Sequence, residues 1–260
     1  MKRSVFSRFL RISAVLCVDL ALMGGSFLAA NAQASGTPTR PLTTTTASSN
    51  SSATKSRFPI ANLQAPGNRE GGASRGSCLT GSQRLTALMP ENSSGRTIAA
   101  HPTLYVYIPN GGEQQAELLL RDLASGKSLY RQPVTINQTP GVVAVAFPAD
   151  QPPLEIDRLY QWQFRLICDP DDRERDLTVA GVVQRVQPSP ALSQQLATAQ
   201  PARKAALFEE AGLWYEALQS TAELRQSDPN LATNQWEALL QEVGLAPITQ
   251  QPIVSCCRQP

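Results

Sequence analysis

Short stretches of alternating hydrophobic and polar residues recur through the middle of the chain, and the clearest of them is Tyr160–Cys168. Its hydrophobic members take every second position: Tyr160, Trp162, Phe164, Leu166 and Cys168. A period of two predicts a β-strand with one buried face. We therefore expect this segment to be an interior strand at the centre of the core.

Other short strands are predicted on both sides of it, separated by turn-forming residues. They cover residues 85–89, 103–108, 117–122, 128–136, 141–147 and 177–186. Short strands at fairly regular spacing, with no helical pattern between them, are typical of an antiparallel sandwich. The pattern therefore predicts an antiparallel immunoglobulin-like β-sandwich over residues 61–187.

A local motif points to the same fold. Leu154 lies six residues before Tyr160, a spacing that resembles the tyrosine corner of immunoglobulin-like sandwiches. In that motif the tyrosine hydroxyl bonds back to nearby backbone. Asp157 stands where the motif usually has glycine, and aspartate tolerates left-handed backbone better than most residues. The motif supports a fold and carries no activity.

The pattern changes to a helical period after residue 187. Ser189 and Pro190 form a typical helix start, with a capping side chain followed by proline at the first helical position. Gly212, Ala217 and Pro229 resemble the loop glycine, second-helix alanine and closing proline of one tetratricopeptide hairpin. One such repeat cannot bury its own hydrophobic face. We therefore predict an α+β fold in which a three- to four-helix segment, residues 188–246, packs on the sandwich.

The N-terminus predicts export. Residues 1–34 combine basic residues, an apolar stretch and small residues suited to cleavage near Ala32 or Ala34, as in a secretory signal peptide. An uncleaved membrane anchor is the alternative. Residues 35–60 are rich in serine and threonine and lack periodicity, which predicts a disordered linker. No later segment is apolar enough to span a bilayer.

Charge argues against two classes of partner. The formal net charge is +2, but residues 1–34 contain four basic residues and one acidic residue, so the rest of the chain carries about one negative charge. A nearly neutral chain has no electrostatic reason to bind nucleic acid or an anionic membrane surface.

Signal cleavage removes Cys17 and leaves four cysteines, which in an exported protein favours disulfides. Three pairings are open, and we prefer Cys78–Cys168 because both residues flank strand-like segments. The adjacent Cys256 and Cys257 lie in a predicted flexible tail, residues 247–260. Intermolecular bridging, a redox role and a loose pair without set chemistry all remain open for them.

No arrangement of residues typical of an enzyme or a metal site is found. The only histidine is His101, and there is no Gly-x-Ser-x-Gly motif and no Cys-x-x-Cys pair. The acidic run 169–176 lacks the glycine and the spaced glutamate of a calcium loop and contains two arginines. The glycine-rich segment 66–76 fits no phosphate-binding motif and is predicted to be an irregular arm. If any residues contact an anion or a partner, Arg69 and Arg75 in this arm are the first candidates.

The chain resembles a family of exported cyanobacterial proteins classed as domain of unknown function 928. The residues that carry the resemblance are Pro66-Gly67-x-Arg69-x-Gly71-Gly72-x-x-Arg75-Gly76, Leu85-Thr86-Ala87-Leu88-x-Pro90, His101-Pro102-Thr103, Thr139-Pro140-Gly141-Val142, Pro153-Leu154-Glu155, Tyr160-x-Trp162-x-Phe164, Cys168-Asp169-Pro170 and Leu213-Trp214-Tyr215-Glu216-Ala217-Leu218. The similarity spans about residues 64–252. It implies export and one unit of strands and helices, and it brings no activity, cofactor or catalytic residue.

These observations predict a non-enzymatic periplasmic or secreted interaction module that works without a cofactor. We expect its partner to be another envelope protein. A small-ligand or glycan-binding protein is the alternative, and an unrecognised hydrolase is the third hypothesis.

Overall fold

Alternating and continuous hydrophobic segments pair into one large sheet in the computed structural model of the chain. The structure describes residues 57–58, 60, 67–72, 78–79, 81–109, 114–137, 139–254 and 256. All of them belong to one compact unit, Ser52–Pro260. Its strands are β1 (Asn68–Gly72), β2 (Thr86–Ala87), β3 (Ser94–Thr97), β4 (Thr103–Ile108), β5 (Gln114–Asp122), β6 (Ser128–Ile136), β7 (Gly141–Ala146), β8 (Leu159–Ile167), β9 (Leu177–Arg185) and β10 (Ile253–Val254).

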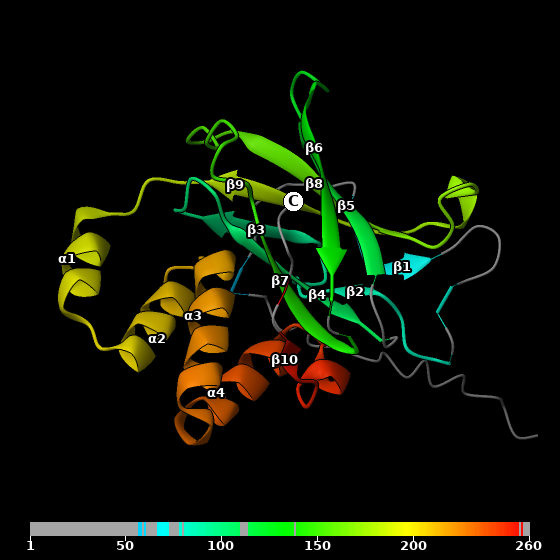
Figure 1. Cartoon of the computed structure of the whole chain (residues 1–260). Coiled ribbons are helices and arrows are strands. Elements are labelled where there is room, and N and C mark those ends of the chain that lie inside the picture. The colour runs from blue at the N-terminus through cyan, green and yellow to red at the C-terminus, as the bar shows by residue number, and fades with distance from the viewer. Residues whose placement is uncertain are drawn as a thin grey trace, which may run out of the picture. The chain divides into compact units, whose positions relative to one another are not determined.

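The sheet runs in the order β10-β7-β4-β2-β1-β9-β8-β5-β6, with β3 paired to β9 outside this path. Strand β1 joins its two halves because it pairs with both β2 and β9. The α+β class is confirmed, but the immunoglobulin-like sandwich is not, because the strands form one curled sheet rather than two separate ones (Figure 1). The sheet is also mixed rather than wholly antiparallel, since β3–β9 and β10–β7 are parallel pairs.

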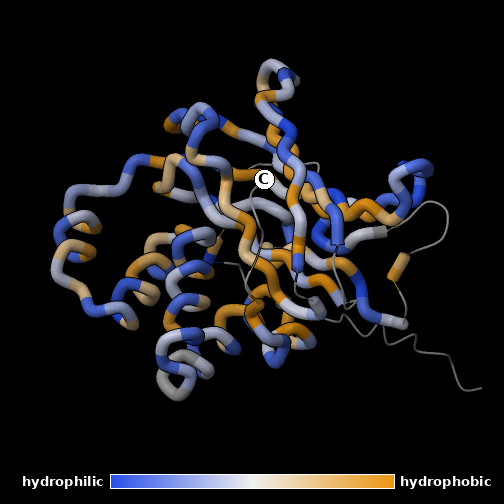
Figure 2. The backbone as a smooth tube through the Cα atoms, in the orientation of Figure 1, coloured by the Kyte–Doolittle hydropathy of each residue, from blue (hydrophilic) through white to orange (hydrophobic). Residues whose placement is uncertain are grey.

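Strand β8 is an interior strand of the sheet, as its alternation predicts. It pairs with β5 on one side and β9 on the other. Tyr160, Trp162, Phe164 and Leu166 are all buried. Between them, Gln161 is buried too, because its side-chain carbonyl accepts a hydrogen bond from Arg121 at 2.8 Å. Hydrophobic positions continue across the neighbouring strands (Figure 2).

Helices follow the strands: α1 (Pro190–Thr198), α2 (Pro201–Glu210), α3 (Trp214–Ser227) and α4 (Pro229–Glu242). Two short 3-10 turns, η1 (Arg173–Arg175) and η2 (Ala246–Ile248), complete the elements. Helix α1 begins as predicted, with the Ser189 hydroxyl accepting a hydrogen bond from the Leu192 N–H and Pro190 at the first position. None of the α1 residues is buried.

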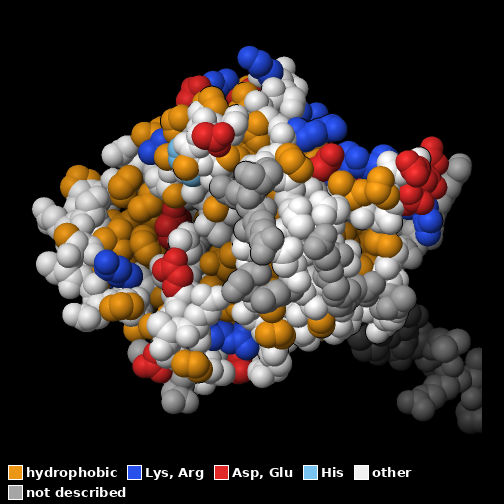
Figure 3. Space-filling view, viewed as in Figure 1, with side chains coloured by type: hydrophobic (Ala, Val, Ile, Leu, Met, Phe, Trp, Pro, Cys, Tyr) orange, Lys and Arg blue, Asp and Glu red, His pale blue; other side chains and the backbone are white. Residues whose placement is uncertain are grey.

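Helix α3 joins the helices to the sheet. The indole N–H of Trp214 donates to the Leu88 carbonyl at 3.0 Å, and the indole N–H of Trp162 donates to the Tyr215 hydroxyl at 2.8 Å. Both tryptophans belong to one continuous hydrophobic core. Hydrophobic side chains are also visible on the surface between the strands and the α1–α2 pair (Figure 3). Strands and helices therefore share a core, as the sequence led us to expect.

Three described residues of the predicted linker, Arg57, Phe58 and Ile60, belong to this fold, and Ile60 is buried. Phe58 is almost fully buried, and its ring packs edge-on against Trp214 with centroids 4.9 Å apart. Arg57 pairs with Glu242 and lies 3.6 Å from a Glu209 carboxylate oxygen. The described fold therefore begins inside the segment that the sequence assigns to the linker.

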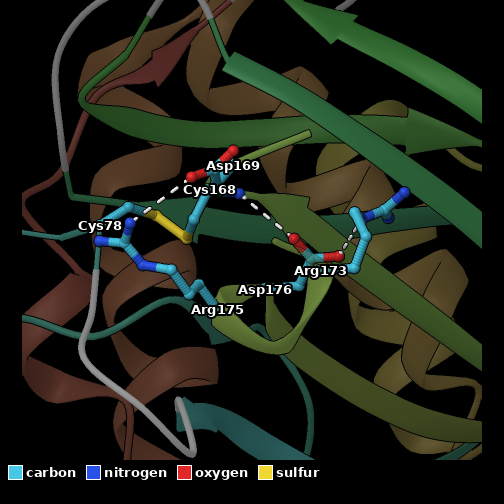
Figure 4. The surroundings of a disulfide bond; sticks show 6 residues. All are labelled: Cys78, Cys168, Asp169, Arg173, Arg175 and Asp176. Atoms are coloured by element: carbon cyan, nitrogen blue, oxygen red, sulfur yellow. Dashed lines mark hydrogen bonds and ion pairs between the residues drawn. A yellow bond between two sulfur atoms is a disulfide. The ribbon is translucent and has the colours of Figure 1, made fainter. Parts of the chain in front are cut away.

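A disulfide joins Cys78 to Cys168, the pairing preferred on sequence grounds, across 90 residues of chain (Figure 4). The predicted acidic run folds beside it as a compact turn. Asp176 accepts hydrogen bonds from the Cys168 N–H at 3.3 Å and from Arg173 at 2.7 Å. Arg175 lies 3.6 Å from Asp169. The two arginines of this run thus pair with two of its five carboxylates, those of Asp169 and Asp176. Cys256 is also disulfide-bonded, whereas Cys257 lies outside the described residues.

Candidate functional site

A cavity of about 280 Å³ lies where the β1–β2–β4 part of the sheet meets the turn after α4. Its walls come from four separate parts of the chain. The lining residues are Glu70, Ser82, Gln83, Arg84, Thr86, Tyr107, Gly244, Leu245, Pro247 and Ile248. Because its lining is polar on the strand side and largely apolar on the helix side, this cavity is the best candidate for a binding site.

Strand pairing places the polar wall. Glu70 of β1 lies opposite Thr86 of β2, and Thr86 lies opposite Tyr107 of β4. The Gly71 N–H donates to the Leu85 carbonyl at 2.7 Å, which fixes the spacing of β1 and β2. Side chains from three strands therefore meet in one row.

The apolar wall depends on the end of α4. Gly244 turns the chain there with a φ of +74°, a left-handed conformation that favours glycine. Arg69, next to Glu70 in β1, donates from one guanidinium nitrogen to the carbonyls of Val243 at 2.5 Å and Met89 at 3.2 Å. Arg69 thus ties β1 to the helix end, and the two walls of the cavity keep a fixed distance.

Within the cavity, the Tyr107 hydroxyl donates to the side-chain carbonyl of Gln83 at 2.6 Å. Burial raises the pKa of Tyr107, so the hydroxyl keeps its proton at neutral pH. Glu70 and Arg84 lie 3.9 Å apart, measured from Oε2 to Nε, and both side chains are more than half exposed. This distance exceeds that of a hydrogen bond, so both charged groups keep bonding capacity for a ligand.

A second hollow, of about 290 Å³, lies between β6 and residues 148–151. Tyr130 and Gln132 line it, and each has a polar side-chain oxygen without a hydrogen-bond partner among the described residues. Both oxygens are fully enclosed. A ligand in this hollow could therefore reach them only if the walls moved, which makes it the weaker candidate.

A family model described as Domain of Unknown Function (DUF928) matches residues 70–253. This range is well over half of the chain and includes every residue that lines the first cavity. The chain belongs to the DUF928 family. No curated protein and no solved structure shows a significant match.

In the DUF928 chain, one guanidinium nitrogen of Arg69 bonds to two backbone carbonyls, and the anion or partner contact predicted for this residue stays a prediction. The other predicted contact, Arg75, lies outside the described residues. The sequence did not predict the cavity, because its strand wall, residues 70–107, and its helix wall, residues 244–248, lie far apart along the chain. The one sequence feature that could have pointed to the cavity was the glycine-rich arm, because it contains Glu70.

The tyrosine-corner residues adopt the geometry that gives the motif its name. The Tyr160 hydroxyl accepts a hydrogen bond from the Glu155 N–H at 3.0 Å. Leu154 is buried beside it, and Asp157 has a φ of +62°. The corner fixes the start of β8, although the sheet around it is not an immunoglobulin-like sandwich.

The Nε2 atom of His101 lies 2.9 Å from the Gln151 carbonyl, to which it donates. Within the described ranges, no group of three or more histidine, cysteine or carboxylate residues could hold a metal ion. Among the same residues, no helix is both long and apolar enough to cross a membrane.

Proposed function

We propose that this DUF928 protein is an exported, non-enzymatic interaction module of the periplasm or cell envelope. The observation that carries the proposal is the Cys78–Cys168 disulfide. Disulfides persist in oxidising compartments and are rare in the reducing cytoplasm. The protein therefore folds and works outside the cytoplasm.

The N-terminal composition supports the same route. A signal peptide over residues 1–34 directs export and is removed near Ala32 or Ala34, and a retained signal would serve as an anchor. The polar spacer that follows ends where Arg57 and Phe58 join the fold. In this proposal the spacer lets the folded part extend away from the membrane. The setting that the family resemblance implies is a cyanobacterial envelope.

Side chains that could serve as catalytic acids or bases form hydrogen bonds that hold the fold, which supports a non-enzymatic role. His101 donates to a backbone carbonyl, and Asp176 holds the turn beside the disulfide. Glu216 accepts three hydrogen bonds from the Thr97–Ala99 segment. Each of these groups already serves the fold. The helices after residue 187, which resemble a tetratricopeptide hairpin, belong to the same module in this proposal.

Crosslinking in intact cells, followed by mass spectrometry, tests this function. We expect the full chain to crosslink to a defined envelope protein. A variant that lacks residues 1–34 and stays in the cytoplasm is the matched control and should lose that partner. A protein that captured no partner but turned over a substrate would overturn the proposal.

The cavity beside β1 favours a second candidate function, the binding of a small ligand. It is preformed, since Arg69 and the Tyr107–Gln83 hydrogen bond hold its walls. A preformed pocket binds its ligand more tightly, because no conformational entropy is lost in ordering its walls. Thermal-shift screening of the oxidised protein against sugars, phosphate and amino acids tests this candidate. A flat response to all three classes would contradict it.

A further inference from the structure

The size of the cavity beside β1 restricts its ligand. At about 280 Å³ it lies just below the range of roughly 300–1,000 Å³ that is typical of pockets for drug-sized ligands. In size the cavity therefore matches a single small metabolite better than an oligosaccharide or a nucleotide.

The charges on the wall restrict the ligand further. Glu70 and Arg84 are the only acidic and basic residues that line this cavity in the described part of the chain. An anion would be attracted by Arg84 and repelled by Glu70. A cation would be attracted by Glu70 and repelled by Arg84. A neutral sugar would leave both charges without a counter-charge. A ligand with an ammonium and a carboxylate group next to each other satisfies both at once.

The Glu70 and Arg84 side chains are also free to bind a ligand instead of each other. Their 3.9 Å separation and high exposure make the Glu70–Arg84 attraction weak. The ammonium and carboxylate groups of an α-amino acid are bonded to the same carbon atom, so its two charges also lie close together. Such a ligand can therefore lie alongside the pair, with its ammonium on Glu70 and its carboxylate on Arg84, without separating the two side chains.

The opposite wall is suited to an aliphatic side chain. Three of the residues that line it there, Leu245, Pro247 and Ile248, have hydrocarbon side chains. Burying an aliphatic group against them adds affinity at about 25 cal/mol per Å² of apolar surface removed from water. The hydroxyl and amide groups of Ser82, Gln83 and Thr86 border the charged side.

We propose that this cavity binds a small zwitterion, a free α-amino acid with an aliphatic side chain. Glu70 accepts hydrogen bonds from its ammonium group, Arg84 donates to its carboxylate, and residues 245–248 cover its side chain. The inference rests on the second candidate function, small-ligand binding at the same cavity.

Calorimetric titration of the oxidised full chain with L-leucine tests the proposal. The matched probes are 4-methylpentanoate, which lacks the ammonium, 3-methylbutylamine, which lacks the carboxylate, and glucose. Hydrogen bonds to charged groups contribute about 1.5–3 kcal/mol, so each single-charge probe should bind about tenfold to a hundredfold more weakly than leucine.

Substitutions of the two charged residues test whether leucine binds in this cavity. Glu70→Gln and Arg84→Gln should each weaken leucine binding at least about tenfold. The controls are Arg203→Gln and Glu210→Gln, an ion pair of similar exposure on α2 that does not line the cavity. These should bind leucine like the unmodified protein. Because all four side chains are exposed, the variants should unfold at unchanged denaturant midpoints.

The outcomes distinguish a zwitterion site from small-ligand binding in general. Leucine binding no tighter than that of its single-charge probes, or unaffected by Arg84→Gln, would overturn the zwitterion site. Glucose binding that Glu70→Gln abolishes, without any leucine binding, would also overturn it but would leave small-ligand binding standing. If no probe bound, the zwitterion site would fall, and the thermal-shift screen of sugars, phosphate and amino acids would decide the second candidate function.

Discussion

At Gly181 the absence of a side chain makes room for the indole of Trp162, which lies directly opposite on β8. A Cβ atom on Gly181 would lie 2.6 Å from the Trp162 ring. We predict that Gly181→Ala lowers the free energy of unfolding by about 1–3 kcal/mol, the usual cost of overpacking a core. Urea unfolding followed by tryptophan fluorescence measures it, with the half-buried Thr178→Ala of the same strand as control. Equal stability of the two variants would contradict this packing.

Glu216 predicts a pH dependence at the residue scale. Burial raises the pKa of its carboxyl above the ordinary 4.5, although hydrogen bonds from Thr97, Ile98 and Ala99 oppose the shift. The stabilisation from its protonated form is complete below pH 4.5 and is lost as the pH rises through the folded-state pKa.

The variant Glu216→Gln, which stays neutral, should lack this component of the pH dependence. The free energy of unfolding, measured from pH 4 upward, should therefore fall less steeply with pH in the variant than in the unmodified protein. Asp150→Asn removes an exposed carboxylate and is the control. Parallel pH profiles for Glu216→Gln and the unmodified protein would contradict this account.

At the scale of elements, the Cys78–Cys168 disulfide joins the segment before β2 to the end of β8. Closing a loop of 90 residues restricts the unfolded chain. Removing the bond by Cys78→Ser together with Cys168→Ser should cost about 2–5 kcal/mol of unfolding free energy. Chemical denaturation of the variant and the oxidised protein measures the difference, and equal midpoints would show that the bond does not stabilise the fold.

The sequence predicted elements well where local pattern decides them. The alternation in β8 and the Ser189–Pro190 helix start depend on neighbouring residues, and both were predicted correctly. Strands β1 and β3 were missed, because Gly71 and Gly95 lie in polar, glycine-containing stretches that are strands only through their pairing with β2 and β9. Strand β10 was missed too, because it lies in the predicted flexible tail and is a strand only through its pairing with β7. The cavity was missed for the same reason, since distant strands and a helix end form it.

At the scale of the whole molecule, the strands and helices depend on one core. Trp214 and Trp236 of the helices are fully buried in the same hydrophobic cluster as Trp162. We predict that a chain ending at residue 187 does not fold cooperatively, because it exposes the surface that α3 covers. Near-ultraviolet circular dichroism and limited proteolysis test this, and a sharp unfolding transition in the shortened chain would contradict it.

Export is the claim on which the functional account depends most. The most direct measurement is peptide mapping, under non-reducing conditions, of the protein recovered from fractionated cells. We predict a Cys78–Cys168 linked peptide in the envelope or periplasmic fraction, with the mature N-terminus just after Ala32 or Ala34. Recovery from the cytoplasm, with Met1 retained and both cysteines free to react with an alkylating agent, would contradict the account.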